Sequence, residues 1–206
     1  MSIFVGIDEA GRGPVLGPMV VAAVWVEPCN IAKLKLFKIK DSKKLTKKQR
    51  EYLYDIILQN SRFHHYIKVM PRIIDSAINM PGDNLNKLEM RIIYSLLKKH
   101  NFTTAFIDSP VKNIKQYLQE LNNLFPSKDI ILEHKADENY IVCSAASIIA
   151  KVIRDRIIDK IRLRYGNCGS GYPSDKKSII FLQRFGLRYP FLFRTSWKTY
   201  STHCVQ

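Results

Sequence analysis

Residues 3–14 read Ile3-Phe4-Val5-Gly6-Ile7-Asp8-Glu9-Ala10-Gly11-Arg12-Gly13-Pro14. The apolar run of residues 3–7 has the length and composition of a buried β-strand, and it leads directly into two carboxylates. Neighbouring side chains on a strand point to opposite faces, so Asp8 and Glu9 can serve one site only if the backbone turns there. Gly11, Gly13 and Pro14 supply such a turn. The stretch therefore predicts a strand that delivers acidic side chains to one edge of a sheet.

Strand and helix signals follow this first strand along the chain. Strands are predicted for residues 19–26, 64–70, 103–107 and 129–133, and helices for 46–59, 84–99, 111–124, 139–164 and 176–185. Three initial strands followed by alternating helices and strands favour an α/β fold with a mixed central sheet flanked by helices. We expect one main domain over residues 1–165 and a C-terminal loop and helical appendage over 166–206, because Gly166, Gly169 and Gly171 interrupt any regular element there.

The composition is that of an ordinary globular protein, with 206 residues, 46% of them hydrophobic and 25% charged. It excludes intrinsic disorder and a collagen-like fold. The longest apolar run, Met19–Val26, is far shorter than the roughly 20 residues that span a bilayer. The N-terminal residues lack the basic start of a signal peptide, and the four cysteines form no Cys-x-x-Cys pair. We therefore expect a cytoplasmic protein without membrane association.

The chain is strongly basic, with 33 Lys and Arg against 18 Asp and Glu and a net charge of +15. Such a balance is typical of proteins that bind polyanions, and it makes nucleic acid the leading partner. A basic, solvated surface without a nucleic-acid partner is the alternative.

Four acidic residues stand at positions that are unusual for solvent-exposed carboxylates. They are Asp8 and Glu9 after the first strand, Asp108 after the fourth, and Asp137 before the long helix. Strand ends gather at one sheet edge, so these residues predict an acidic pocket. Any one of them alone is better explained as a cap or turn residue. Four carboxylates would repel a polyanion unless divalent cations bind between them. Two Mg²⁺ or Mn²⁺ ions about 4 Å apart would supply phosphoryl-transfer chemistry at an all-oxygen site.

The loop of residues 11–17 does not fit a dinucleotide-binding fingerprint. Its third glycine is one residue late, and Pro14 breaks the transition from loop to helix. Gly11 and Gly13 are better suited to close approach of the backbone to a sugar-phosphate. A plain tight turn is the alternative.

The residues also resemble a known family. The N-terminal Ile7–Pro14 signature is similar to that of ribonuclease HII, the type 2 ribonuclease H, and the match continues in the family's order almost to the C-terminus. The further matching motifs are Asp41–Leu45, Asn84–Asn86 with Glu89, Asp108, Lys135–Asp137, Ser144–Val152 with Arg154-Asp155, Gly169–Asp175 and Arg194–Thr199. The last two resemble the archaeal and eukaryotic branch most.

The resemblance implies a ribonuclease H-like fold, with residues 1–165 as the catalytic domain. It implies that Asp8, Glu9, Asp108 and Asp137 are the metal-binding catalytic carboxylates. Gly11, Arg12 and Gly13 match the loop that senses the ribose 2′-hydroxyl, and Tyr172 matches the tyrosine that packs on the sugar of the adjoining deoxynucleotide. Separate recognition of the ribose and of the adjoining deoxyribose is physically reasonable, because only the 2′-hydroxyl distinguishes RNA from DNA at one nucleotide.

Phosphate contacts are expected from Ser42, Lys43 and Lys44, which lie on a loop before a helix, and from Lys198 in the Arg194–Thr199 motif. For each loop lysine, a solvated basic turn is an equally good explanation.

The predicted function is an endoribonuclease that hydrolyses RNA in RNA/DNA hybrids and cuts 5′ of ribonucleotides embedded in duplex DNA, leaving a 3′-hydroxyl and a 5′-phosphate. The alternatives are a DNA-directed nuclease of the same fold and a non-catalytic nucleic-acid-binding module. We expect a monomer, and the final residues, Ser201–Gln206, contain no recognisable sliding-clamp peptide.

Overall fold

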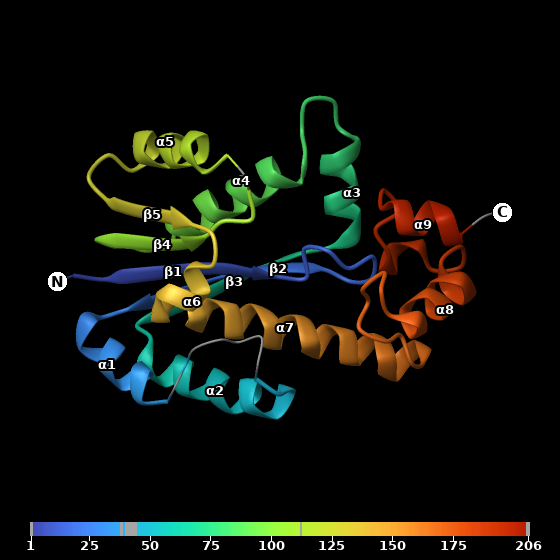
Figure 1. The fold of residues 1–206 in the computed structure, drawn as a ribbon, viewed down its shortest axis with the longest axis horizontal. Coiled ribbons are helices and arrows are strands. Elements are labelled where there is room, and N and C mark those ends of the chain that lie inside the picture. Colours follow the sequence, from blue (N-terminus) through green and yellow to red (C-terminus); the bar gives the residue numbers. More distant parts are fainter. Residues whose placement is uncertain (1, 38, 40–44, 112, 205–206) are drawn as a thin grey trace. The chain divides into compact units, whose positions relative to one another are not determined.

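The computed structural model describes residues 2–37, 39, 45–111 and 113–204 (Figure 1). The chain forms two compact units. Unit 1 comprises residues 1–10, 21–67 and 89–152, and unit 2 comprises residues 11–20, 68–88 and 153–206. The predicted C-terminal appendage, residues 166–206, belongs to unit 2. The division at residue 165 into a catalytic domain and a C-terminal appendage stays a prediction.

A five-stranded mixed sheet has the order β3-β2-β1-β4-β5. Its strands are β1 (Phe4–Ala10), β2 (Met19–Val26), β3 (Phe63–Val69), β4 (Thr104–Asp108) and β5 (Asp129–Glu133). β1, β4 and β5 are parallel neighbours. All five strands predicted from the sequence are confirmed, and the α/β fold class with them.

The helices are α1 (Pro28–Leu36), α2 (Lys47–Asn60), α3 (Pro71–Asn79), α4 (Leu85–Leu97), α5 (Ile114–Leu124), α6 (Ala136–Asn139), α7 (Ile141–Tyr165), α8 (Lys176–Phe185) and α9 (Lys198–His203), with a 3₁₀ turn η1 (Pro190–Leu192). The five predicted helices are confirmed as α2, α4, α5, α7 and α8. α5 begins three residues later than predicted. The sequence analysis missed α1, α3, α6 and α9.

Local capping explains where the predicted helices begin. The Thr46 side chain accepts a hydrogen bond from the Gln49 amide, and the Gln49 side chain accepts one from the Thr46 amide, so α2 starts with a complete capping box. Asn84 Oδ1 accepts a hydrogen bond from the Lys87 amide at 3.0 Å, which fixes the start of α4. The start of α3, a helix that was not predicted, is also marked in the sequence, because Pro71 occupies its first turn.

In unit 1, β1 packs directly against the start of α7. A Cβ atom on Gly6 would lie 2.1 Å from the backbone carbonyl of Val142 and 2.5 Å from the Cys143 amide nitrogen. Only glycine permits this approach. Figure 1 shows α1 and α2 on the side of the sheet that faces the start of α7, and α5 on the other side. The first turns of α7 are therefore held against the strand that carries Asp8.

Unit 2 has an apolar core of its own, formed by Val15, Leu16, Ile158, Ile161, Cys168, Phe181, Leu182, Leu192 and Phe193. Leu16 and Phe193 form an antiparallel β-bridge, and the Val15 amide donates to the Gly171 carbonyl at 2.9 Å. These contacts join the loop that follows β1 to the C-terminal segment. No helix in the described part of the chain is long and apolar enough to cross a membrane.

Candidate active site

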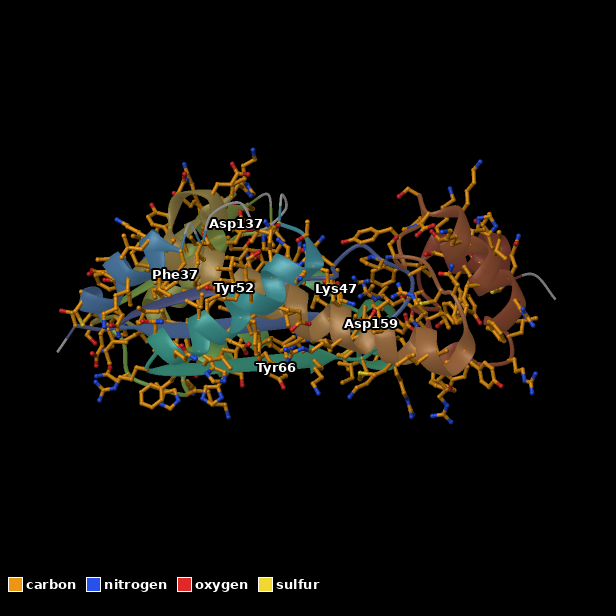
Figure 2. All side chains as sticks on the ribbon, turned by 90° about the horizontal axis from the view of Figure 1, so that it is seen from below. Phe37, Lys47, Tyr52, Tyr66, Asp137 and Asp159 are labelled. Atoms are coloured by element: carbon orange, nitrogen blue, oxygen red, sulfur yellow. The ribbon has the colours of Figure 1, made fainter. Side chains whose placement is uncertain are left out.

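Three of the four predicted carboxylates gather at one edge of the sheet in unit 1. In the parallel pairing of β1 with β4, Ile7 lies opposite Ile107, so the residues that follow them, Asp8 and Asp108, come from neighbouring strands. The backbone amide of Ala136 donates a hydrogen bond to Asp108 Oδ1 at 2.8 Å. Asp137, labelled in Figure 2, is the next residue of α6.

The backbone around Asp137 is fixed from both sides. Lys135 has a positive φ of 60°, a left-handed conformation that lets the chain turn from β5 into α6. The Ser144 hydroxyl on α7 donates to the carbonyl oxygen of Asp137. Only 2% of the Asp137 surface is exposed, so its carboxylate is held inside unit 1.

The carboxylate of Asp8 lies within the electrostatic influence of the other two. The pKa of Asp8 is raised from 3.8 to about 7, chiefly by burial and further by the negative charges of Asp108 and Asp137. A hydrogen bond with Ser147 and the positive charge of Lys151 act in the opposite direction. Lys151 Nζ in turn donates to Ser147 Oγ at 2.9 Å. α7 thus supplies a polar pair that faces the carboxylate of β1.

The chemistry of this donor set fits a divalent cation. Carboxylate oxygens are the ligands that Mg²⁺ and Mn²⁺ prefer, and a cation would offset the mutual repulsion of the buried carboxylates. Among the described residues, however, no three His, Cys, Asp or Glu side chains already stand in a metal-binding arrangement.

The raised pKa of Asp8 predicts a pH-dependent stability for the metal-free protein. The folded state keeps a proton on Asp8 up to a pH of about 7, whereas the unfolded chain releases it near 3.8. Between these values the folded state binds more protons, so the contribution of Asp8 to stability falls as pH rises, by at most about 1.4 kcal/mol per pH unit. Urea unfolding in EDTA at pH 4, 5.5 and 7 checks this, with Asp8→Asn as the reference that lacks the group. A difference between the two proteins that is independent of pH would contradict it.

Glu9 differs from the expectation. β1 continues through Glu9 to Ala10, so the backbone does not leave the strand where the sequence predicted a turn. Successive strand side chains alternate between faces, so the side chains of Asp8 and Glu9 start from opposite faces of β1. Its amide instead donates to Asp8 Oδ1 at 2.6 Å. A metal-binding role for the half-buried Glu9 side chain stays a prediction.

The predicted 2′-hydroxyl loop and Tyr172 lie together in unit 2. A Cβ atom on Gly13 would stand 3.6 Å from Tyr172 Cε1, so Gly13 borders the ring. Gly11 has a φ of +79°, which favours glycine, and Arg12 Nη2 donates to Asn86 Oδ1 at 2.6 Å. The two features that the resemblance assigned to sugar recognition are therefore adjacent.

Arg154 supports both of them. It is 7% exposed, its guanidinium carbon lies 5.7 Å from the Tyr172 ring centroid, and its Nη2 donates to the Ser170 carbonyl at 3.3 Å. A Cβ atom on Gly11 would lie 2.3 Å from Arg154 Nε. Burial lowers the pKa of Arg154. Tyr172 remains 42% exposed, so its ring rests on a buried cation and is still open to a ligand.

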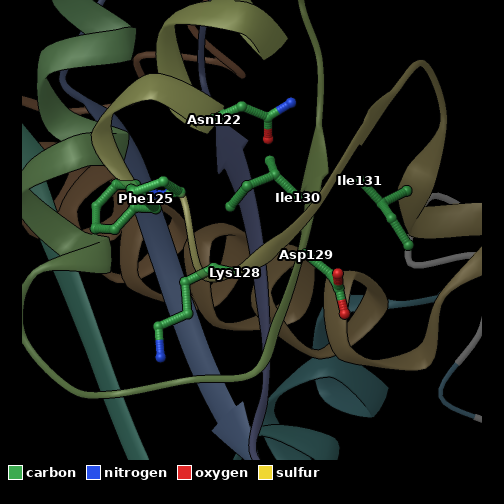
Figure 3. Close-up of a pocket in the computed structure, with 7 residues that line it drawn as sticks. Asn122, Phe125, Lys128, Asp129, Ile130 and Ile131 are labelled. Carbon is green, nitrogen blue, oxygen red and sulfur yellow. The ribbon is translucent and has the colours of Figure 1, made fainter.

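The remaining predicted site residues are those expected to contact phosphates. Lys198 is exposed at the start of α9 in unit 2. Ser42, Lys43 and Lys44 lie outside the described residues. A pocket beside β5, lined by Asn122, Phe125, Pro126, Lys128, Asp129, Ile130 and Ile131, contains none of the predicted site residues (Figure 3).

The sequence analysis assigned no role to Ser147, Lys151, Arg154, Arg194 or Trp197. All five lie inside or beside motifs that carried the family resemblance. Ser147 and Lys151 are four residues apart on a predicted helix, a spacing that places polar side chains on one face. For Arg194 and Trp197, nothing in the neighbouring sequence indicated a role.

Comparisons with known proteins decide the family. The sequence model described as Ribonuclease HII matches residues 5–200. The chain is 43% identical to the ribonuclease HII of Thermococcus onnurineus, over 94% of this chain and 86% of that protein. It belongs to the ribonuclease HII family. The enzyme is therefore a metal-dependent endoribonuclease of a family that acts on RNA/DNA hybrids.

Solved structures of this family share the fold. The ribonuclease H2 of Pyrococcus horikoshii superposes with a TM-score of 0.87 at 35% identity, covering 97% of this chain and 96% of that one. The ribonuclease HII of Archaeoglobus fulgidus, solved in complex with PCNA, gives a TM-score of 0.88 at 35% identity and covers 98% and 97%. The predicted ribonuclease H-like fold is confirmed.

Proposed function

We propose that this ribonuclease HII cuts on the 5′ side of ribonucleotides embedded in duplex DNA, as well as within RNA/DNA hybrids, and leaves a 3′-hydroxyl and a 5′-phosphate. Asp8, Asp108 and Asp137, with Glu9, would hold two divalent ions at the cleavage site. The observation that carries this proposal is the buried Asp8 carboxylate beside Asp108 and Asp137, with a pKa of about 7. Such a cluster is unfavourable for binding a polyanion unless cations are bound as well.

The chain's own residues would prepare this site. Two divalent ions held by Asp8, Asp108 and Asp137, with Glu9, would supply the activation of water and the stabilisation of the leaving oxygen. The Ala136 amide orients Asp108, and Ser147 with Lys151 contacts Asp8 from α7. Asp8 would lose its proton as a cation binds, because the positive charge of the cation stabilises the deprotonated carboxylate.

Recognition would come from the loop of residues 11–13 and from Tyr172. The loop brings backbone within reach of a sugar, and the exposed ring offers an apolar face for a deoxyribose that lacks a 2′-hydroxyl. These features favour a ribonucleotide-directed enzyme over the alternative, a DNA-directed nuclease of the same fold.

Mapping both ends of the cut tests the proposal. A DNA duplex with one ribonucleotide, labelled on that strand, should be nicked 5′ of the ribonucleotide, with a 3′-hydroxyl that a polymerase extends. A cut on the 3′ side that leaves a 2′,3′-cyclic phosphate would contradict it, since the 2′-hydroxyl itself would then be the nucleophile.

The exposed Lys198 should contribute to affinity through phosphate contact. Lys198→Ala should weaken binding to any duplex and lower the slope of log K against log salt by about one unit. Fluorescence anisotropy at several salt concentrations measures the slope. Lys33→Ala, an exposed lysine of α1 outside the predicted contacts, is the matched control. An unchanged slope for Lys198→Ala would remove Lys198 from the phosphate contacts, and Lys43 and Lys44 are open to the same test.

Two further expectations stay predictions: a monomeric state and a cytoplasmic location. The net charge of +15 supports a nucleic-acid partner.

A further inference from the structure

Arg194 is completely buried in unit 2, and its guanidinium binds the backbone of the loop that follows β1. Its Nη1 donates to the Arg12 carbonyl at 2.6 Å, and its Nη2 donates to the carbonyl of Gly11. Nε and Nη2 also donate to the carbonyl of Gly17, at 3.3 and 3.2 Å. One arginine thus holds three carbonyls that are more than 170 residues away in sequence.

Trp197 continues the same pattern. Its indole Nε1 donates to the Gly13 carbonyl at 3.1 Å, and its ring lies 4.9 Å from the Arg194 guanidinium carbon. The two side chains together therefore bind the carbonyls of three consecutive residues, Gly11, Arg12 and Gly13.

The segment that carries these two side chains is itself fixed. The Asp75 carboxylate on α3 accepts hydrogen bonds from the amide and hydroxyl of Thr195 and from the amide and hydroxyl of Ser196. The Arg194 amide also donates to the Val15 carbonyl at 2.8 Å. The loop is thus held against an anchored turn.

The direction of the bound carbonyls shows where the amide N–H groups of the loop point. No cis peptide bond occurs among the described residues. In a trans peptide the carbonyl of one residue and the amide of the next point in opposite directions. With the carbonyls of Gly11 and Arg12 bound to Arg194, the amides of Arg12 and Gly13 point away from it. Gly13 is exposed and borders Tyr172.

We propose that Arg194 and Trp197 are positioning residues that determine ribonucleotide specificity. Arg194 binds the carbonyls of Gly11 and Arg12 and thereby aims the amides of Arg12 and Gly13 at the sugar-phosphate of the substrate. Trp197 binds the carbonyl of Gly13, and because the next residue, Pro14, has no amide hydrogen, this bond fixes the end of the loop in place. This inference rests on the proposed role of residues 11–13 in sensing the 2′-hydroxyl. It assigns the specificity of the loop to a segment about 180 residues downstream.

Two variants separate positioning from general stability. Trp197→Phe keeps an aromatic ring near Arg194 and removes the donor to Gly13, together with the second ring of the indole. Arg194→Lys keeps the charge but loses the planar guanidinium, whose Nε, Nη1 and Nη2 reach the three carbonyls from separate positions. Tyr200→Phe is the matched control, because it removes a single hydrogen bond to a different carbonyl of unit 2, that of Gly186. If Arg194→Lys fails to fold, Trp197→Phe still decides the question.

The first measurement uses the free protein. Hydrogen exchange followed by mass spectrometry should show faster exchange in a peptide covering residues 10–18 for Trp197→Phe and Arg194→Lys, and no change for Tyr200→Phe. Because no substrate is present, this result does not depend on the proposed function. Unchanged exchange in the folded variants would overturn the positioning role.

The second measurement compares binding, in Ca²⁺, of two duplexes that differ by one 2′-hydroxyl. The affinity ratio should fall roughly threefold to tenfold in Trp197→Phe, as expected for one lost hydrogen bond, with little change in affinity for the all-DNA duplex. Tyr200→Phe should keep the wild-type ratio. A wild-type ratio retained in Trp197→Phe would overturn the specificity role. If the wild-type protein binds the two duplexes equally well, the proposed function is refuted, and the specificity role with it. The hydrogen-exchange result would still show whether Arg194 and Trp197 position the loop.

Discussion

Asp8→Asn is expected to reduce the rate of cleavage by roughly a thousandfold or more, which corresponds to about 4 kcal/mol of transition-state stabilisation. The amide has nearly the shape of the carboxylate but no negative charge, so it loses the attraction for the divalent ions that this family requires. Single-turnover cleavage of a duplex with one ribonucleotide, in saturating Mg²⁺, measures the loss.

The fold of this variant should be intact. Asp8 is buried, and its pKa of about 7 means that the charged form is unfavourable in the metal-free protein. A neutral side chain should therefore preserve the stability at pH 7 or increase it. Asp129→Asn, which changes an exposed carboxylate of β5 in the same way, is the matched control and should cleave normally. Near wild-type turnover in Asp8→Asn would remove Asp8 from the catalytic site.

Tyr172→Ala is expected to lower activity on a single embedded ribonucleotide by roughly tenfold to a hundredfold, and activity on continuous hybrid RNA much less. A deoxyribose 3′ to the sensed ribose packs flush against the ring, whereas a 2′-hydroxyl there would be pressed against an apolar face and lose hydration. The ring is well placed for this contact, because it is 42% exposed and rests on the buried Arg154.

Kinetics on both substrates decide this prediction. Tyr172→Phe keeps the ring and its contact with Arg154, so it should retain most of the preference for the single ribonucleotide. Equal losses on the two substrates in Tyr172→Ala would show that Tyr172 is structural and that another group recognises the junction.

Much of the fold was readable from local sequence patterns. The apolar runs at residues 3–7 and 19–26 predicted β1 and β2, because a buried strand needs a short β-branched stretch between turn residues. Thr46 marked the start of α2 through its capping box. The grouping of Asp8 and Asp108 followed from the rule that parallel strands deliver their ends to one edge.

Other features depend on contacts that no local pattern contains. β1 extends to Ala10, three residues beyond the predicted apolar run, so the chain leaves the strand at Gly11 and not between Asp8 and Glu9. The one-turn helix around Asp137 depends on a left-handed Lys135, a conformation that the lysine side chain does not favour by itself. Arg194 binds carbonyls across more than 170 residues, and only the folded unit 2 brings them together.

The central claim is metal-dependent hydrolysis directed by a 2′-hydroxyl, and one measurement tests it most directly. Two duplexes of the same sequence, one all-DNA and one with a single ribonucleotide, are incubated with the enzyme while Mg²⁺ is titrated from zero. The account predicts that only the ribonucleotide duplex is cut, only when Mg²⁺ is present, and on its 5′ side. Equal cutting of the all-DNA duplex, or cutting in EDTA, would contradict it.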